Sequence, residues 1–248
     1  MDKIKVFTST VYAQEEANKL TRWLAPEVEI VDSILTADVV LFKGGADISP
    51  DIYNNKRLTN FTRIINHTRD MVEVEHFQEA VKHNKFIIGI CRGAQLTCAL
   101  SGGYLIQHVT NHVRDHKVVL KDPIFPKKYH QLLATSTHHQ MMYPYNINPQ
   151  DYDLYAWATK LSTTYTHSIP TGEFNRKMIE IREPEVVYFK KTKALAIQAH
   201  PEFVPGSTNY SYSHRRYVFK LRQLFKKLYV EHKRQQEANR TRCKSSSR

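Results

Sequence analysis

The fold is decided by one continuous stretch of the chain, FIIGICRGAQLTCAL, which runs from Phe86 to Leu100. It opens on an uninterrupted apolar run, which is typical of a strand buried on both faces of a parallel sheet. It ends on residues that favour a helix. The residues between them, Gly89-Ile90-Cys91-Arg92-Gly93, predict a sharp strand-to-helix turn of the nucleophile-elbow type, with cysteine in place of serine.

Cys91 is the candidate nucleophile at this turn. Small residues are needed at Gly89 and Gly93 because such a turn crowds the backbone and holds the central residue in a strained conformation. The dipoles of the following helix favour the thiolate, which is the reactive form of cysteine. Taken alone, the motif also fits a structural cysteine in an ordinary loop. Cys98, on the same predicted helix, is expected to serve packing only.

A candidate base follows another apolar strand, predicted from Ala194 to Ile197. The sequence there reads His200-Pro201-Glu202. The imidazole of His200 could exchange a proton with a thiol, and the Glu202 carboxylate could orient it and favour its protonated form. We expect this segment and Cys91 to meet at the carboxyl edge of one sheet.

A third motif, Lys43-Gly44-Gly45-Ala46-Asp47, follows a predicted buried strand from Asp38 to Phe42. Paired glycines let the backbone approach a ligand and direct an N–H group at it, as an oxyanion hole requires. We expect one N–H from Gly45 and the other from Arg92, just after the candidate nucleophile. A Gly-Gly turn that merely ends a strand is the alternative.

The rest of the sequence predicts an α/β domain. Strands at 4–7, 28–31 and 38–42 alternate with a helix at 15–24, and a second helix covers about 68–83. After Leu100, short alternating segments predict a mixed sheet with hairpin extensions. An amphipathic helix with apolar residues between Tyr217 and Leu228 comes last. We expect one catalytic domain over 1–228 and a flexible basic tail over 229–248.

Composition narrows the class of protein. The 248 residues are 41% hydrophobic and 24% charged, which suits a globular domain. The sequence has no signal-peptide pattern and no apolar run near the roughly 18–20 residues of a membrane span. Its three cysteines form no disulfide framework, so we expect a reducing, cytoplasmic setting and no membrane partner.

The net charge is 36 − 24 = +12. Half of it lies between Lys226 and Arg248, where eight basic and two acidic residues give 8 − 2 = +6. Such a tail could bind nucleic acid by counterion release. Solvated basic tails more often serve solubility, so we do not expect nucleic acid to be a partner.

Six motifs occur in order and together resemble the class I glutamine amidotransferase superfamily, specifically its γ-glutamyl-γ-aminobutyrate hydrolase-like branch. The motifs are GGADISPDIY (44–53), RD (69–70), GICRGAQ (89–95), SGGYLIQ (101–107), STHHQ (136–140) and QAHPE (198–202). The resemblance covers about residues 1–225. It implies a flavodoxin-like αβα sandwich with a mostly parallel central sheet and β-hairpin extensions. It also implies a catalytic triad of Cys91, His200 and Glu202.

The resemblance further implies which residues bind the substrate. Gln95 matches a position that helps to hold a glutamyl group, and Asp47 and Tyr53 match positions near the mouth of a pocket. A loop that closes over the substrate is matched by His138, His139 and Gln140. The sequence departs from the family at Ala199, where relatives carry an aromatic residue, so a more open pocket wall is expected there.

We expect no metal and no organic cofactor. His108, His112 and His116 are spaced by four and could line one face of a helix as metal ligands. The intervening residues do not favour a helix, however, and the resemblance places an extended segment here.

The expected function is cleavage of a γ-glutamyl amide, in a γ-glutamyl-amine, a γ-glutamyl peptide or glutamine. A thioester on Cys91 would release glutamate together with an amine or ammonia. Two alternatives stay open: a glutaminase subunit that delivers ammonia to a separate synthase, and a catalytically silent nucleic-acid-binding module. The amine leaving group and the oligomeric state are not defined by the sequence.

Overall fold

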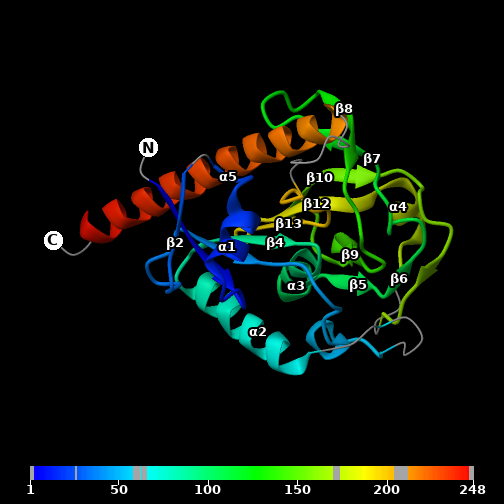
Figure 1. The fold of residues 1–248 in the computed structure, drawn as a ribbon, viewed down its shortest axis with the longest axis horizontal. Coiled ribbons are helices and arrows are strands. Elements are labelled where there is room, and N and C mark those ends of the chain that lie inside the picture. The colour runs from blue at the N-terminus through cyan, green and yellow to red at the C-terminus, as the bar shows by residue number, and fades with distance from the viewer. Residues whose placement is uncertain are drawn as a thin grey trace.

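A computed structural model describes residues 3–25, 27–57, 62, 66–169, 174–203 and 212–245. Its centre is a nine-stranded sheet in the order β2-β1-β3-β4-β13-β12-β10-β7-β8 (Figure 1). The first five strands pair in parallel. They are β1 (Ile4–Ser9), β2 (Val28–Ile30), β3 (Val39–Phe42), β4 (Phe86–Ile90) and β13 (Ala194–Ile197).

The other four strands extend the sheet through antiparallel pairs. They are β12 (Glu183–Phe189), β10 (Tyr152–Ala158), β7 (His116–Lys121) and β8 (Tyr129–Ala134). Two small sheets pair β5 (Tyr104–Ile106) with β9 (Met141–Tyr143), and β6 (His108–Val109) with β11 (Tyr165–Thr166). The predicted α/β class and the mixed sheet with hairpin extensions are confirmed.

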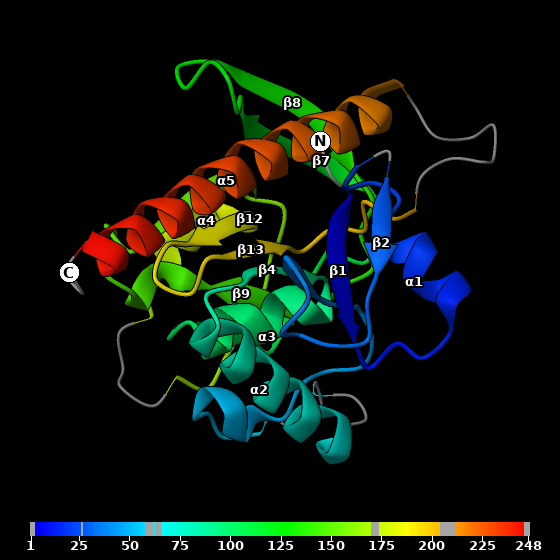
Figure 2. The same ribbon diagram turned by 90° about the vertical axis from the view of Figure 1, so that its left-hand side faces the viewer.

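Helices cover both faces of the sheet. Figure 2 shows α5 (Tyr212–Ser245) on one side and α2 (His67–Lys82) and α3 (Arg92–Leu100) on the other. The face covered by α5 also receives α1 (Gln14–Thr21), through Leu20. Alternate residues of β3 serve the two cores, because Leu41 packs on the α5 side and Phe42 on the α2 side. The result is the predicted αβα sandwich. A short helix, α4 (Arg176–Ile181), and two 3₁₀ turns, Pro50–Tyr53 and Pro144–Asn146, complete the elements.

The decisive strand β4 lies at the middle of this arrangement. All five of its residues are buried, as its unbroken apolar sequence predicts. Its two neighbours, β3 and β13, are equally buried. A sheet covered on both faces leaves only its strand ends open to a ligand, so the carboxyl edge of these three strands is where a site can form.

The helix α5 continues past the expected domain boundary at residue 228. Its later turns dock on the body of the protein, because His232 is buried with its ring 5.8 Å from that of Phe86. Lys233 Nζ binds Asp38 Oδ1 at 2.9 Å. The first part of the expected tail is therefore helical and packed, while the boundary itself remains a prediction. Among the helices that the structure describes, none is both long and apolar enough to cross a membrane.

Deleting residues 229–248 should lower the free energy of unfolding by about 3 kcal/mol, because it removes the packing of Tyr229 and His232 against Phe86. Urea denaturation followed by circular dichroism measures this change. Truncation after Ala238 is the control, since it keeps the docked turns and should stay within about 1 kcal/mol of the full chain. Equal stability of the two truncated proteins would show that the docked turns contribute nothing.

Candidate active site

Cys91 occupies the turn between β4 and α3 in the strained conformation that an elbow requires. Its φ is 51° and its side chain is 7% exposed. A β-carbon on Gly89 would lie 2.3 Å from the carbonyl oxygen of Gly93, and one on Gly93 would lie 2.2 Å from that of Phe42. Only glycine fits at either position, so the predicted turn is present for the predicted reason.

His200 and Glu202 follow β13, the strand beside β4. The Cys91 N–H donates to the carbonyl of Ile197 at 2.8 Å, which fixes the elbow against the end of β13. His200 Nδ1 lies 2.7 Å from Glu202 Oε1. The structure thus brings Cys91, His200 and Glu202 together at one sheet edge. It also places Thr137 Oγ1 2.9 Å from His200 Nε2, a partner that the sequence reasoning did not single out within STHHQ.

The surroundings of His200 favour its charged form. Burial lowers the pKa of His200, but hydrogen bonding and charge from Cys91 and Glu202 outweigh burial and raise the pKa to about 10. Phe203 stacks on the ring with centroids 4.5 Å apart. The site therefore holds a positioned imidazolium at neutral pH, beside the sulfur of Cys91 and the carboxylate of Glu202.

The glycine loop after β3 approaches both groups. A β-carbon on Gly44 would lie 3.1 Å from His200 Cε1 and 3.5 Å from Cys91 Cβ. Gly45 has a φ of 148°, and a β-carbon there would lie 2.4 Å from Arg69 Nη1. Arg69 Nη2 donates to the carbonyl of Gly44 at 3.1 Å. Because a trans peptide directs its C=O and N–H to opposite sides, the Gly45 N–H points away from Arg69.

A buried ion network supports this loop from behind. The Arg92 guanidinium binds the carboxylates of Asp70 and Glu73, and all three residues are at most 2% exposed. Arg69 Nε binds Glu73 Oε1 at 2.8 Å. Asp70 Oδ2 accepts from the N–H of Ser49 at 2.9 Å. Two cations and two anions thus join α2, α3 and the loop after β3. The sequence reasoning noted Arg69 and Asp70 but missed Glu73, whose spacing of four from Arg69 was the available signal.

A cavity of about 390 Å³ opens over these groups. Eight predicted site residues line it together with Ala46 and Thr137: Gly45, Asp47, Cys91, Gln95, His138, His139, Gln140 and His200. Arg92 and Glu202 lie behind the wall. Tyr53 packs in the core with Phe42 and Ile48 instead, so the expectation that it borders the pocket does not fit the structure. Ala199 is likewise a core residue, so it does not open the pocket wall.

Polar side chains line the cavity together with Cys91. Gln95 Nε2 donates to the carbonyl of Gln140 at 3.1 Å, and His139 Nε2 lies 3.2 Å from Asp47 Oδ2. The side-chain amide of Gln140 is fully buried, and neither of its polar atoms has a hydrogen-bond partner among the described residues. A buried amide without a partner is costly, but a ligand in the cavity would reach this one only after the side chain moves.

The comparisons with known proteins agree with this arrangement. A family model of peptidase C26 matches residues 11–149. The chain belongs to the peptidase C26 family. This family lies within the class I glutamine amidotransferase superfamily. The matched residues include Cys91, whereas His200 and Glu202 fall beyond them, so their place beside Cys91 rests on the geometry above.

Among curated proteins, the similarity is partial. NtpR of Enterococcus hirae is 37% identical over 75 residues, which are 30% of this chain and 31% of NtpR. The glutamine amidotransferase-like protein YvdE of Lactococcus lactis is 35% identical over 88 residues, which are 34% of this chain and 36% of YvdE. The chain therefore spans about a third of the length of these relatives.

Solved structures share the whole fold at low sequence identity. A glutamine amidotransferase from Thermotoga maritima has a TM-score of 0.55 and 12% identity, and the alignment covers 92% of this chain and 99% of that one. The glutaminase domain of a Trypanosoma brucei CTPS with bound acivicin has a TM-score of 0.52 and 13% identity, covering 92% and 94%. At such identities the likeness shows the fold of this peptidase C26 member and no more.

The pKa of His200 should fall in a Cys91→Ala variant. In the wild type the raised pKa keeps the imidazole protonated at neutral pH, and the charge is lost as the pH rises through about 10. Without the thiol only Glu202 opposes burial, so the charge should be lost at a lower pH. Titration of the histidine ring nitrogens by NMR measures this, and an unchanged value would rule out the Cys91 contact as its cause.

Glu73→Gln should cost about 3–5 kcal/mol of the free energy of unfolding, because it leaves the buried guanidinium of Arg92 and the partly buried one of Arg69 with one carboxylate. Guanidinium denaturation measures the loss. Glu75→Gln is the matched control, since Glu75 is an exposed residue of the same helix, and it should change stability by less than about 0.5 kcal/mol. Similar small effects of both substitutions would contradict the proposed role of the network.

Proposed function

We propose that this peptidase C26 member is a cysteine hydrolase that cleaves γ-glutamyl amide bonds, with Cys91 as nucleophile, His200 as acid and base, and Glu202 as the group that orients His200. One observation carries the proposal. The strained Cys91 and a His200 imidazolium held 2.7 Å from Glu202 share the floor of one cavity with the glycine loop.

The first half-reaction forms a thioester. The Cys91 thiolate adds to the γ-carbonyl carbon, and the carbonyl oxygen becomes an oxyanion. Gly45 and Arg92 supply its N–H donors. The Gly45 N–H is turned away from Arg69, and the Arg92 N–H has no acceptor within α3 because Arg92 is the first residue of that helix. His200 then gives its proton to the leaving nitrogen as the C–N bond breaks.

The second half-reaction hydrolyses the thioester. Neutral His200 takes a proton from a water molecule, whose oxygen adds to the thioester carbonyl. The second oxyanion occupies the same pair of N–H donors and collapses with release of glutamate. The Cys91 thiolate and the His200 imidazolium are thereby restored. Glu202 stays charged throughout and holds the imidazole by its Nδ1 atom.

The polar wall supplies the recognition of the glutamyl group. Gln95 and Gln140 line the cavity together with Cys91, and a glutamine amide can both donate to a carboxylate and accept from an ammonium group. His139 and Asp47 also line the cavity, where the imidazole and the carboxylate lie side by side. A substrate with adjacent amino and carboxylate groups, such as a γ-glutamyl compound, suits this set of partners.

A glutaminase subunit is the second candidate. The same two half-reactions release ammonia when the substrate is glutamine, and the structural neighbours include a glutaminase domain. A synthase partner would then receive the ammonia. The segment STHHQ favours the stand-alone hydrolase, because it resembles the hydrolase-like branch of the superfamily.

Glutamate release from glutamine, γ-glutamyl amines and γ-glutamyl peptides tests the proposal. Cys91→Ser should lower turnover by a factor on the order of 10³ or more, because it replaces a thiolate with a poorly ionised hydroxyl. Cys98→Ser is the matched control on the same helix. Cys98 is buried away from the cavity with its sulfur 3.6 Å from the carbonyl of Tyr104, so serine can donate there and activity should persist.

The substrate panel also separates the candidates. Turnover of a γ-glutamyl amine by the protein alone establishes the hydrolase, whereas slow turnover of glutamine alone favours the glutaminase subunit. A Cys91→Ser protein that is folded and as active as the wild type would contradict both the hydrolase and the glutaminase subunit. Salt-dependent nucleic-acid binding without any glutamate release would support the silent module instead.

A further inference from the structure

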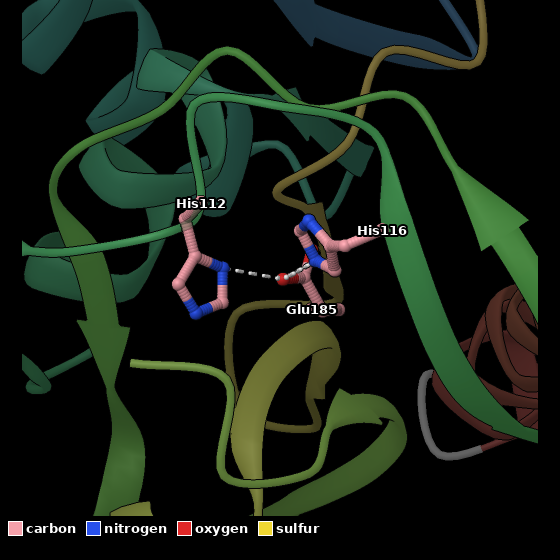
Figure 3. A group of neighbouring side chains, drawn as sticks. All are labelled: His112, His116 and Glu185. Carbon is pink, nitrogen blue, oxygen red and sulfur yellow. Dashed lines mark hydrogen bonds and ion pairs between the residues drawn. The ribbon is translucent and has the colours of Figure 1, made fainter. Parts of the chain in front are cut away.

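Three histidines and two glutamates meet in the interior behind the cavity. Figure 3 shows His112, His116 and Glu185 with their side chains directed toward one another. His138 and Glu183 join them. Four of the five side chains are at most 3% exposed and His116 is 7% exposed. The residues come from the loop before β7, from β7, from the loop before β9 and from β12, so only the fold brings them together.

One ring nitrogen of each histidine faces the same carboxylate oxygen. Glu185 Oε1 lies 2.9 Å from His116 Nε2, 3.3 Å from His112 Nδ1 and 3.5 Å from His138 Nε2. The second oxygen of Glu185, His112 Nδ1 and His138 Nε2 have no hydrogen-bond partner of good geometry among the described residues. Buried polar atoms usually have such partners, so three exceptions in one cluster call for a ligand.

The other ring nitrogen of each histidine is held by an acceptor. His112 Nε2 lies 3.0 Å from Glu183 Oε2, and His116 Nδ1 lies 3.0 Å from the carbonyl of Arg114. His138 Nδ1 lies 2.8 Å from the carbonyl of Gln140. Carbonyl and carboxylate oxygens only accept, so each outer nitrogen carries the proton. In a neutral ring the inner nitrogen is therefore unprotonated and carries a lone pair. All three inner nitrogens then face Glu185 Oε1, which is also an acceptor.

We propose that His112, His116, His138 and Glu185 bind a divalent transition-metal ion, Zn²⁺ above all. Metal-bound histidines characteristically donate their second N–H to a carboxylate or carbonyl, as all three rings do here. A tetrahedral zinc ion with bonds of about 2.0–2.1 Å separates its ligand atoms by about 3.3 Å. The three distances from Glu185 Oε1 bracket that value, and the ligand atoms of His112, His116 and Glu185 lie within 4.8 Å of one another, so side-chain movements on the order of 1 Å would bring them onto an ion.

Protons are the competing occupants of this cluster. A proton on the inner nitrogen of one histidine would satisfy that nitrogen against Glu185, but the other inner nitrogens would still face an acceptor. One proton therefore satisfies the cluster only in part. A zinc ion accepts all four lone pairs at once.

Four protein ligands leave no open position, so the ion has a structural task. Its place in the fold suggests which task. His138 also lines the cavity, between Thr137 and His139. An ion bound to His138 and to Glu185 of β12 would fix this wall of the cavity to the central sheet.

This site differs from the one that the histidine spacing suggests. His108 lies outside the cluster, in β6, with its ring 5.8 Å from that of His139. The segment is not helical, since bends connect β6 to β7, and its two remaining histidines have their partners far along the chain, at 138 and 185. The expectation of no metal rested on rejecting a helix, and it did not consider such distant partners.

Metal content decides the proposal. The full chain is prepared without a histidine tag and with Cys91→Ala, so that no active-site thiolate binds metal. It is loaded with Zn²⁺, dialysed, and measured by mass spectrometry of the metal. We expect one zinc ion per chain, and loss of stoichiometric zinc in Glu185→Gln and His116→Gln. His130→Gln is the matched control, because His130 pairs with Asp122 outside the cluster, and it should keep its zinc.

Two further measurements sharpen the test. Glu183→Gln should weaken zinc binding by roughly 10–100-fold, because it removes the acceptor of a ligand's second N–H. Cobalt(II) in place of zinc should give the intense visible bands of a tetrahedral ion with nitrogen and oxygen ligands, without a thiolate charge-transfer band. This measurement decides the matter if the cluster variants fail to fold.

The proposal is overturned by any of three results. The chain could retain only trace zinc after dialysis. Folded Glu185→Gln and His116→Gln proteins could keep as much zinc as the His130→Gln control. Cobalt(II) could give only the weak bands of an octahedral surface ion. None of these results depends on whether the chain hydrolyses γ-glutamyl amides.

Discussion

The candidate site depends on a set of four charges, the buried Arg92, Asp70 and Glu73 with the partly buried Arg69. Removing charges from water costs several kcal/mol per ion, and the cost is offset only where each charge is paired and its remaining hydrogen bonds are made. Here each partner also fixes a piece of backbone. Arg69 holds the carbonyls of Lys43 and Gly44, and Asp70 holds the N–H of Ser49. The ion pairs thereby fix the position of the loop after β3, and this loop faces Cys91.

The candidate site depends equally on the backbone turn at Cys91. Cys91 keeps a positive φ because Gly89 and Gly93 permit contacts that no β-carbon would. Arg92 takes part in both the turn and the ion network, since its N–H lies at the start of α3 while its guanidinium reaches the carboxylates of α2. The backbone geometry at Cys91 and the charge pairing in the interior therefore cannot be changed independently.

Sequence reasoning found the parts of the site that are encoded locally. The elbow could be predicted because crowding acts between residues adjacent in the chain, and the edge shared by β4 and β13 because both strands are continuously apolar. It did not find Thr137 or the partners of His112, since those contacts join elements far apart in sequence. It also missed Glu73, whose spacing from Arg69 was readable but whose pairing with Arg92 joins two different helices. Tyr53 was misplaced for a similar reason. The motif that contains Tyr53 predicted a position near the mouth of the pocket, but the 3₁₀ turn at Pro50–Tyr53 directs the ring into the core.

The topology of the sheet also governs when the site can exist. The strand β13 lies between β4 and β12, yet it is the last strand in the described part of the chain. During synthesis, Cys91 is therefore complete long before the strand that carries its partners leaves the ribosome. Until then β4 has an open edge of buried-type residues, which other chains could pair with. Under the proposed function, the nascent protein is thus inactive and most prone to aggregation over the same interval, and insertion of one central strand ends both conditions together.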